Sequence, residues 1–141
     1  MKNILVVLII SALAAVSQAK EQSYTSHCFV QPCKIEGDFD GDGKLDTAEL
    51  VEGAAKKRGI QIKFSSGKSA VVGAGTKLDK GGDDFIWMTT WQLHKGKIEK
   101  SKGAGKAPKA KGDSLLVAEE YVKSAYIYWD GAKLKWYPQE Q

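Results

Sequence analysis

Apolar and polar residues alternate along several short stretches of the chain, and these stretches predict β-strands. Residues 60–64 read Ile-Gln-Ile-Lys-Phe, which is the alternation of a strand with one buried face. Residues 85–93 are rich in β-branched and aromatic residues, which favour strands. Four further stretches are also predicted strands, residues 69–73, 115–118, 124–129 and 133–137. Asp130-Gly131 lies between the last two and is typical of a tight hairpin turn. The pattern predicts a mainly β fold, either an antiparallel meander or a small sandwich.

Residues 47–58 fit two structures. Most of these residues favour helix, and Gly59 is a suitable helix stop. Gly53 weakens the helical interpretation because a glycine inside a helix is destabilising. The alternative is a short strand through Leu50 and Val51 followed by a loop. The sequence leaves a short helix and a strand open.

Residues 1–19 have the three parts of a secretory signal peptide. Lys2 supplies a positive charge, residues 4–16 form an apolar run, and the small residues Ser17 and Ala19 precede a cleavage site. The apolar run is shorter than the roughly 20 residues that a membrane-spanning helix needs. We therefore expect an exported protein, periplasmic or secreted, without a membrane span.

The two cysteines, Cys28 and Cys33, lie in a polar and irregular segment over residues 20–36. Exported chains usually pair their cysteines, so we expect a disulfide here. A metal site formed by both cysteines and His27 is the alternative, but oxidation competes with it. The rest of the chain, residues 37–141, has the length of a single β-rich domain.

Residues 38–49 form the strongest chemical motif in the chain. They match the calcium-loop pattern D-x-[DN]-x-[DN]-G-x₅-E at every fixed position. Calcium takes about six to eight oxygen ligands, and alternate residues of a tightly wound loop can supply them. The predicted ligands are the side chains of Asp38, Asp40, Asp42, Asp46 and Glu49 and the backbone carbonyl of Lys44.

The chemistry of this loop favours a bound cation. Gly43 permits a sharp turn that a β-carbon would disfavour. We expect Leu45 to turn away from the ion and pack on the core. Carboxylates packed this closely repel one another unless a cation lies between them. We therefore predict Ca²⁺, with a solvated acidic turn as the alternative; Mg²⁺ fits less well because it keeps more of its water.

Residues 37–46, Gly-Asp-Phe-Asp-Gly-Asp-Gly-Lys-Leu-Asp, resemble the calcium loop of the FG-GAP/VCBS repeat group and are also similar to an EF-hand loop. Pro32 and the β pattern of the remaining chain favour the first resemblance. It implies that the loop joins two strands, with ligands at Asp38, Asp40, Asp42, the Lys44 carbonyl and Asp46. It also implies that Glu49 lies on the following strand, which leaves its role as a ligand open.

Residues 82–87 and the hairpin at 128–137 extend the likeness to small bacterial exported proteins that carry one such loop. That resemblance covers most of the mature chain but implies no function. A propeller needs several blades, and this chain has a single calcium loop.

Lysines are concentrated in one segment. Residues 95–111 contain Lys95, Lys97, Lys100, Lys102, Lys106, Lys109 and Lys111 and the single acid Glu99. Residues 100–112 contain no apolar residue larger than Ala and Pro, so we expect a flexible loop. The loop could bind a protein partner or a cell-surface polyanion. The scarcity of aromatic residues among its lysines disfavours specific recognition of nucleic acid.

The sequence contains no nucleophile elbow, HExxH motif or P-loop. We therefore expect a non-enzymatic, calcium-binding β module with a binding or structural role. One alternative is an inhibitor or immunity protein that blocks a secreted enzyme with its aromatic hairpin or Lys-rich loop. Another is an enzyme with an unrecognised site around Asp83, Asp84 and His94. Oligomeric state is left open.

Overall fold

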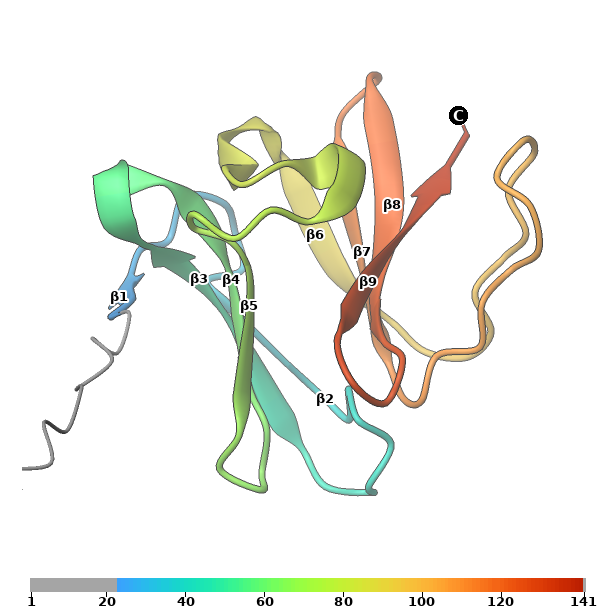
Figure 1. Ribbon diagram of the computed structural model, residues 1–141, viewed down its shortest axis with the longest axis horizontal. Coiled ribbons are helices and arrows are strands. Elements are labelled where there is room, and N and C mark those ends of the chain that lie inside the picture. The colour runs from blue at the N-terminus through green and yellow to red at the C-terminus, as the bar shows by residue number, and fades with distance from the viewer. Residues whose placement is uncertain (1–22, 141) are drawn as a thin grey trace, which may run out of the picture.

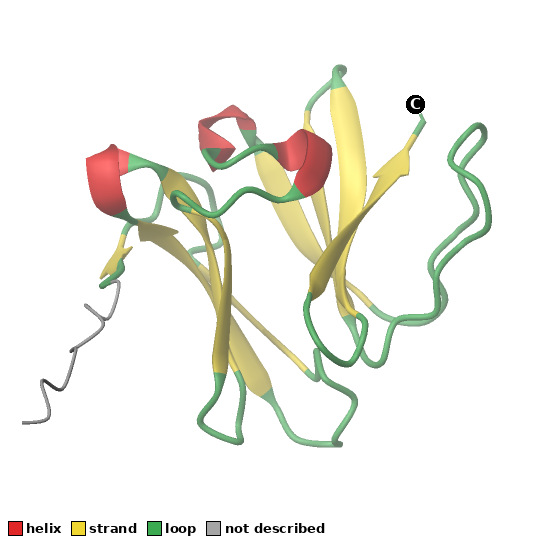
Figure 2. Cartoon of the chain, in the orientation of Figure 1, coloured by secondary structure: helices red, strands yellow, loops and turns green. Residues whose placement is uncertain are grey.

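Two antiparallel sheets form the body of the protein in the computed structural model, which describes residues 23–140 (Figures 1 and 2). The first sheet contains β1 (Thr25–Ser26), β2 (Lys34–Gly37), β3 (Asp46–Glu52), β4 (Arg58–Lys63) and β5 (Ser69–Gly73). The second contains β6 (Thr90–His94), β7 (Ser114–Glu119), β8 (Lys123–Trp129) and β9 (Leu134–Gln139). The prediction of a mainly β, antiparallel fold is confirmed. The predicted signal peptide lies outside the described residues.

Each sheet follows the order of the chain closely. The second sheet has the order β6-β7-β8-β9, and the turn at Asp130 and Gly131 joins its last two strands. The first sheet has the order β1-β3-β4-β5, and β2 also pairs with β3. The two short strands β1 and β2 lie along different parts of β3, opposite Val51–Glu52 and Asp46–Glu49 respectively.

A single apolar core lies between the two sheets. Alternate residues of each strand point inward, as the period of a pleated strand requires. The first sheet contributes Ala48, Leu50, Ile60 and Ile62, and the second contributes Leu115, Val117, Ala125 and Ile127. These eight side chains are at most 1% exposed. The two sheets are therefore packed face to face around shared side chains.

The helical interpretation of residues 47–58 is wrong. This segment forms most of β3, then the single 3-10 turn η1 (Ala54–Lys56), and then β4. The intrinsic helix preference is overridden because β3 pairs with strands on both sides and buries Ala48, Leu50 and Val51. Likewise, part of the predicted strand at 85–93 forms the 3-10 turn η3 (Phe85–Trp87) before β6 begins; a further 3-10 turn, η2 (Asp79–Gly81), precedes it.

The N-terminal segment is held against the body of the protein. The predicted disulfide joins Cys28 and Cys33. The segment is less irregular than expected, because it contains β1 and β2. The indole N–H of Trp91 donates a hydrogen bond of 2.7 Å to the Pro32 carbonyl and so connects it to the second sheet. Over residues 23–140, the structure has no helix with the length and apolar character of a membrane span.

Residues 95–113, here named the Lys-rich arm, connect β6 to β7 as two limbs that run side by side (Figure 1). The arm packs on the outer face of the second sheet, where Ile98 forms a small cluster with Tyr126 and Tyr137. The Tyr137 hydroxyl accepts a hydrogen bond of 3.0 Å from the Ser101 N–H and donates one of 3.1 Å to the Gly105 carbonyl. Composition alone did not predict these contacts.

Candidate metal-binding loop

The calcium loop was predicted over residues 38–49. Its first part, residues 38–45, joins β2 to β3 and is here named the Asp loop, and the rest lies on β3. This placement between two strands agrees with the connection that the FG-GAP/VCBS resemblance implies. One carboxylate oxygen from each of Asp38, Asp40 and Asp42 lies within 4.8 Å of the other two. Asp38 and Asp40 are half-buried and Asp42 is exposed. The structure therefore brings together three acidic groups that could hold a metal ion.

Hydrogen bonds from the backbone to the carboxylates wind the Asp loop. The Asp38 carboxylate accepts the N–H groups of Gly41, Asp42 and Gly43 at 2.9, 3.1 and 2.8 Å. Gly41 and Gly43 have φ angles of 76° and 84°, a region that residues with a β-carbon rarely adopt. Glycine at these positions lets the chain turn so that its N–H groups point at Asp38.

The carboxylates of Asp40 and Asp42 have different electrostatic environments. Partial burial raises the pKa of Asp40, and the negative charges of Asp46 and Asp42 add to that effect. The N–H of Lys44, which donates to Asp42 at 2.8 Å, lowers the pKa of Asp42. The Asp42 carboxylate also accepts a hydrogen bond of 3.1 Å from the Ser65 hydroxyl. Negative charge is therefore less stable on Asp40 than on Asp42.

Two other predicted ligands, Asp46 and Glu49, are not members of this cluster of three. Asp46 is the first residue of β3 and is 1% exposed. Its two oxygens accept the N–H groups of Phe39 and Ser65, both at 2.9 Å. Glu49 lies on β3, where it accepts a hydrogen bond from the Ser26 hydroxyl and lies 4.0 Å from the Lys34 ammonium. Asp46 thus braces the Asp loop, and Glu49 connects β3 to the two short strands.

The apolar anchor of the Asp loop differs from the sequence expectation. Leu45, expected to pack on the core, is 67% exposed. Phe39 takes this role, because its ring is 1% exposed and belongs to the core between the sheets. The loop therefore enters the core near its start rather than at its end.

Sequence reasoning missed the partner of the Asp loop, which is the base of the Lys-rich arm. The Asp113 N–H donates to the Asp38 carbonyl at 2.7 Å, and the Asp38 N–H donates to the Asp113 carboxylate at 2.9 Å. A β-carbon on Gly41 would lie 2.0 Å from the Lys111 carbonyl oxygen, and one on Gly112 would lie 2.0 Å from the Asp38 carbonyl oxygen. The glycines on both sides of this contact are visible in the sequence, but no local pattern indicates that Gly41 and Gly112 meet.

The residues named for an unrecognised enzyme have separate structural contacts. Asp84 caps η3 by accepting the Ile86 N–H at 3.1 Å and also accepts the Arg58 N–H at 3.0 Å. Asp83 forms an ion pair with Lys57. The His94 ring lies 2.8 Å from the Lys97 carbonyl through its Nε2 atom.

The two tryptophans of the β8–β9 hairpin pack against aromatic residues from other elements. Trp129 lies against Phe64, with ring centroids 4.9 Å apart. Trp136 meets Trp87 edge to face at 5.9 Å. These contacts give both indoles a place beside the core.

Comparison of the chain with protein-family models, with curated proteins and with solved structures found no match.

Proposed function

We propose that the protein is an exported, non-enzymatic β module that binds one Ca²⁺ ion in the Asp loop and is stabilised by it. The main support is the approach of the Asp38, Asp40 and Asp42 carboxylate oxygens to within 4.8 Å of one another. Such an arrangement of hard oxygen donors on a short glycine-containing loop suits a hard divalent cation. A cation at this place would also offset the mutual repulsion of the three charges.

Calcium fits the loop better than magnesium. Calcium accepts irregular sets of oxygen ligands, whereas magnesium requires nearly octahedral geometry and retains several waters. The Lys44 carbonyl and Asp46 are the further ligands that we assign, as the FG-GAP/VCBS resemblance implies. We do not assign Glu49 as a ligand, since its carboxylate interacts with Ser26 and Lys34.

The position of the loop explains how an ion would act on the whole domain. The Asp loop connects β2 to β3, buries Phe39 in the core and contacts the base of the Lys-rich arm at Asp113. An ion that binds only the folded loop would therefore stabilise all three connections. Its contribution would be about 2.7 kcal/mol when free calcium is 100 times the dissociation constant.

Export is part of the proposal because the chain combines a signal-peptide pattern with a disulfide between Cys28 and Cys33. Disulfides persist in oxidising compartments such as the periplasm and the extracellular space. Expression of the full chain in a bacterium with periplasmic fractionation checks this part. We expect the mass of the recovered protein to correspond to a chain that begins at Lys20.

Thermal unfolding with calcium and with chelator tests the metal site. We expect calcium to raise the melting temperature of the purified mature protein and EGTA to reverse the shift. Asp42→Asn keeps the side-chain shape but removes one charge, so it should abolish the calcium-dependent shift. Asp79→Asn, the same change at an exposed acid on η2, should retain it.

Two results would contradict the calcium assignment. Identical melting curves in calcium and in EGTA would remove it. A shift that magnesium reproduces at equal concentration, or that Asp79→Asn abolishes as fully as Asp42→Asn, would show that the Asp loop is not a calcium-selective site.

A further inference from the structure

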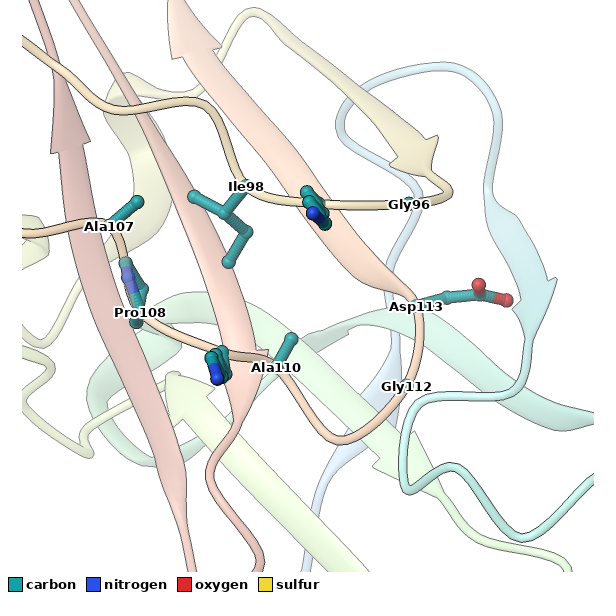
Figure 3. A pocket seen from close by; sticks show the side chains of 9 residues that line it. Gly96, Ile98, Ala107, Pro108, Ala110, Gly112 and Asp113 are labelled. Carbon is teal, nitrogen blue, oxygen red and sulfur yellow. The ribbon is translucent and has the colours of Figure 1, made fainter.

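A groove with a volume of about 600 Å³ lies between the two limbs of the Lys-rich arm (Figure 3). One wall is formed by Gly96, Lys97 and Ile98, and the other by residues of the returning limb from Ala107 to Asp113. Figure 3 shows Ile98 on one chain segment and Ala107, Pro108 and Ala110 on the facing segment. The volume is within the range of about 300–1,000 Å³ that is typical of ligand sites.

The charge of the groove selects an anionic occupant. Lys97 and Lys109 line it from opposite limbs, and both are exposed. Five further lysines, at positions 95, 100, 102, 106 and 111, lie on the same arm with the single acid Glu99. Asp113, at the end of the groove, directs one carboxylate oxygen to the Asp38 N–H. Positive charge is thus distributed along the arm, which suits a ligand with repeated negative charges.

The apolar residues in the walls of the groove disfavour nucleobases and lipid chains as occupants. The apolar surface of the groove comes from Ile98, Ala107, Pro108 and Ala110, and none of the described residues that line it is aromatic. Bases bound by proteins usually stack on aromatic side chains, and Tyr126 and Tyr137 lie buried beneath the arm. Small apolar side chains offer a base no ring on which to stack and give an acyl chain little depth, whereas the charged groups of a polysaccharide can be held by lysines without stacking.

The walls of the groove are fixed at several points. Ile98 is buried against the second sheet, and the Tyr137 hydroxyl bonds to Ser101 and Gly105 beyond the groove. The Lys111 N–H donates to the Trp129 carbonyl at 3.1 Å, next to the contact between Asp113 and Asp38. Binding to a groove whose walls are already held costs less ordering entropy than binding to a free loop.

We propose that this groove binds a chain of an anionic polysaccharide, with ammonium groups of Lys97 and Lys109 contacting its carboxylate or sulfate groups. The proposal names a partner for the module proposed above, but it does not require a metal ion in the Asp loop. The rings would lie between the two walls, against the apolar side chains, and the other lysines of the arm would contact more distant charges.

Titration calorimetry with short saccharides tests the proposal in 0.15 M salt. The probes are a short oligogalacturonate, which carries carboxylates, and a heparin oligosaccharide, which carries sulfates. We expect saturable binding of at least one of them, both in EGTA and in calcium. Measurements in EGTA separate this outcome from the fate of the calcium proposal, because failure of the Asp loop to bind calcium leaves the EGTA arm unaffected.

Matched variants place the binding in the groove. The double variant Lys97→Ala/Lys109→Ala should weaken binding by about tenfold or more. Hydrogen bonds to charged groups contribute more than about 1.4 kcal/mol, and 1.4 kcal/mol corresponds to a tenfold change in affinity. Lys68→Ala/Lys80→Ala removes the same charge at two exposed positions outside the groove and should leave affinity within about twofold of wild type. Ala107→Met narrows the groove without changing charge and should also weaken binding, with its melting temperature as the control for folding.

Three outcomes would overturn the proposal. The first is no binding of either saccharide at millimolar concentration. The second is equal weakening by the two lysine pairs, which would indicate attraction to net charge alone. The third is tighter binding of an oligothymidylate or an acidic peptide of matched charge than of both saccharides, which would assign the groove to another class of polymer.

Discussion

At the scale of single residues, two glycines let the backbone of the Asp loop lie close to the backbone of the Lys-rich arm. Gly41 and Gly112 each approach the opposite backbone so closely that a β-carbon would lie 2.0 Å from a carbonyl oxygen. Gly43 has a similar φ to Gly41 but no atom within 4 Å of the position of its β-carbon. Gly41 is therefore required both for its φ angle and for lack of space, whereas Gly43 is required for its φ angle alone.

We predict that Gly41→Ala destabilises the protein much more than Gly43→Ala. Both substitutions place alanine in the left-handed region, which costs roughly 1–2 kcal/mol. Gly41→Ala adds a collision with the Lys111 carbonyl, and overpacking of this kind typically costs about 1–3 kcal/mol more. Urea unfolding of both variants in EGTA measures the difference. Equal urea midpoints for the two variants would show that the Lys-rich arm moves away from this contact at little cost in free energy.

The ion pair between Lys57 and Asp83 gives a second prediction, on pH dependence. Its hydrogen bond and charge lower the pKa of Asp83 below the ordinary value of 3.8 and raise the pKa of Lys57 above 10.5. The stabilisation is therefore present between these values and is lost as the pH falls through the lowered pKa of Asp83. Asp83→Asn should lower the melting temperature slightly at pH 7.

The difference between Asp83→Asn and wild type should shrink as the pH falls below 3.8, the ordinary Asp value. Thermal unfolding at a series of pH values follows this difference. Lys57→Met should show the same loss at pH 7, and the double variant should lose little more than either single variant. A constant difference across the acid range would assign the effect to something other than the ion pair.

At the scale of elements, local patterns predicted several strands well. Ser69–Gly73 was predicted at its observed bounds, and the hairpin around Asp130 and Gly131 was also confirmed. Residues 47–58 were ambiguous because their helix preference is local, while β3 is stabilised by pairing with β2, β1 and β4. Contacts between distant segments decided that element, and local propensity does not report them.

The same limit applies to the candidate site. The spacing of Asp38, Asp40 and Asp42 was sufficient to predict that their carboxylates meet. The roles of Ser65 and Asp113 depend on loops that approach from elsewhere in the fold. Phe39 rather than Leu45 anchors the loop, because burial depends on where the core lies relative to the loop.

Tyr137 provides a prediction about the Lys-rich arm as an element. Its hydroxyl bonds to both limbs, at Ser101 and Gly105, and each such bond contributes about 0.5–1.5 kcal/mol. Tyr137→Phe should therefore make local opening of the arm roughly tenfold more frequent while changing global stability little. Limited digestion by a lysine-specific protease, with fragments identified by mass, reports this opening.

Tyr126→Phe is the matched control for that experiment. Tyr126 lies in the same cluster beneath the arm, but no hydrogen bond joins its hydroxyl to the arm among the described residues. It should be digested at the rate of the wild type. If both variants were cleaved equally fast, apolar packing rather than the Tyr137 hydroxyl would hold the arm.

At the scale of the whole molecule, the shared core predicts that the two sheets unfold together. All four tryptophans, Trp87, Trp91, Trp129 and Trp136, belong to the second sheet or to η3 beside it. Ile60 is fully buried in the first sheet, and its truncation to alanine typically costs about 2–5 kcal/mol. Ile60→Ala should therefore shift the tryptophan fluorescence transition and the far-ultraviolet dichroism transition by the same amount.

Leu45→Ala is the control for the core substitution, because Leu45 is 67% exposed and its truncation should have little effect. A fluorescence transition that Ile60→Ala leaves unmoved would show that the second sheet folds without the first.

The contact between Gly41 and Gly112 also bears on how related sequences can be recognised. Each position has room only for a hydrogen atom, whereas most lysines of the arm between β6 and this contact are solvent-exposed. Related chains can therefore differ in the length and charge of that excursion while keeping both glycines. A sequence pattern that describes this architecture therefore requires the acidic loop and the distant glycine–aspartate pair, with a gap of variable length between them.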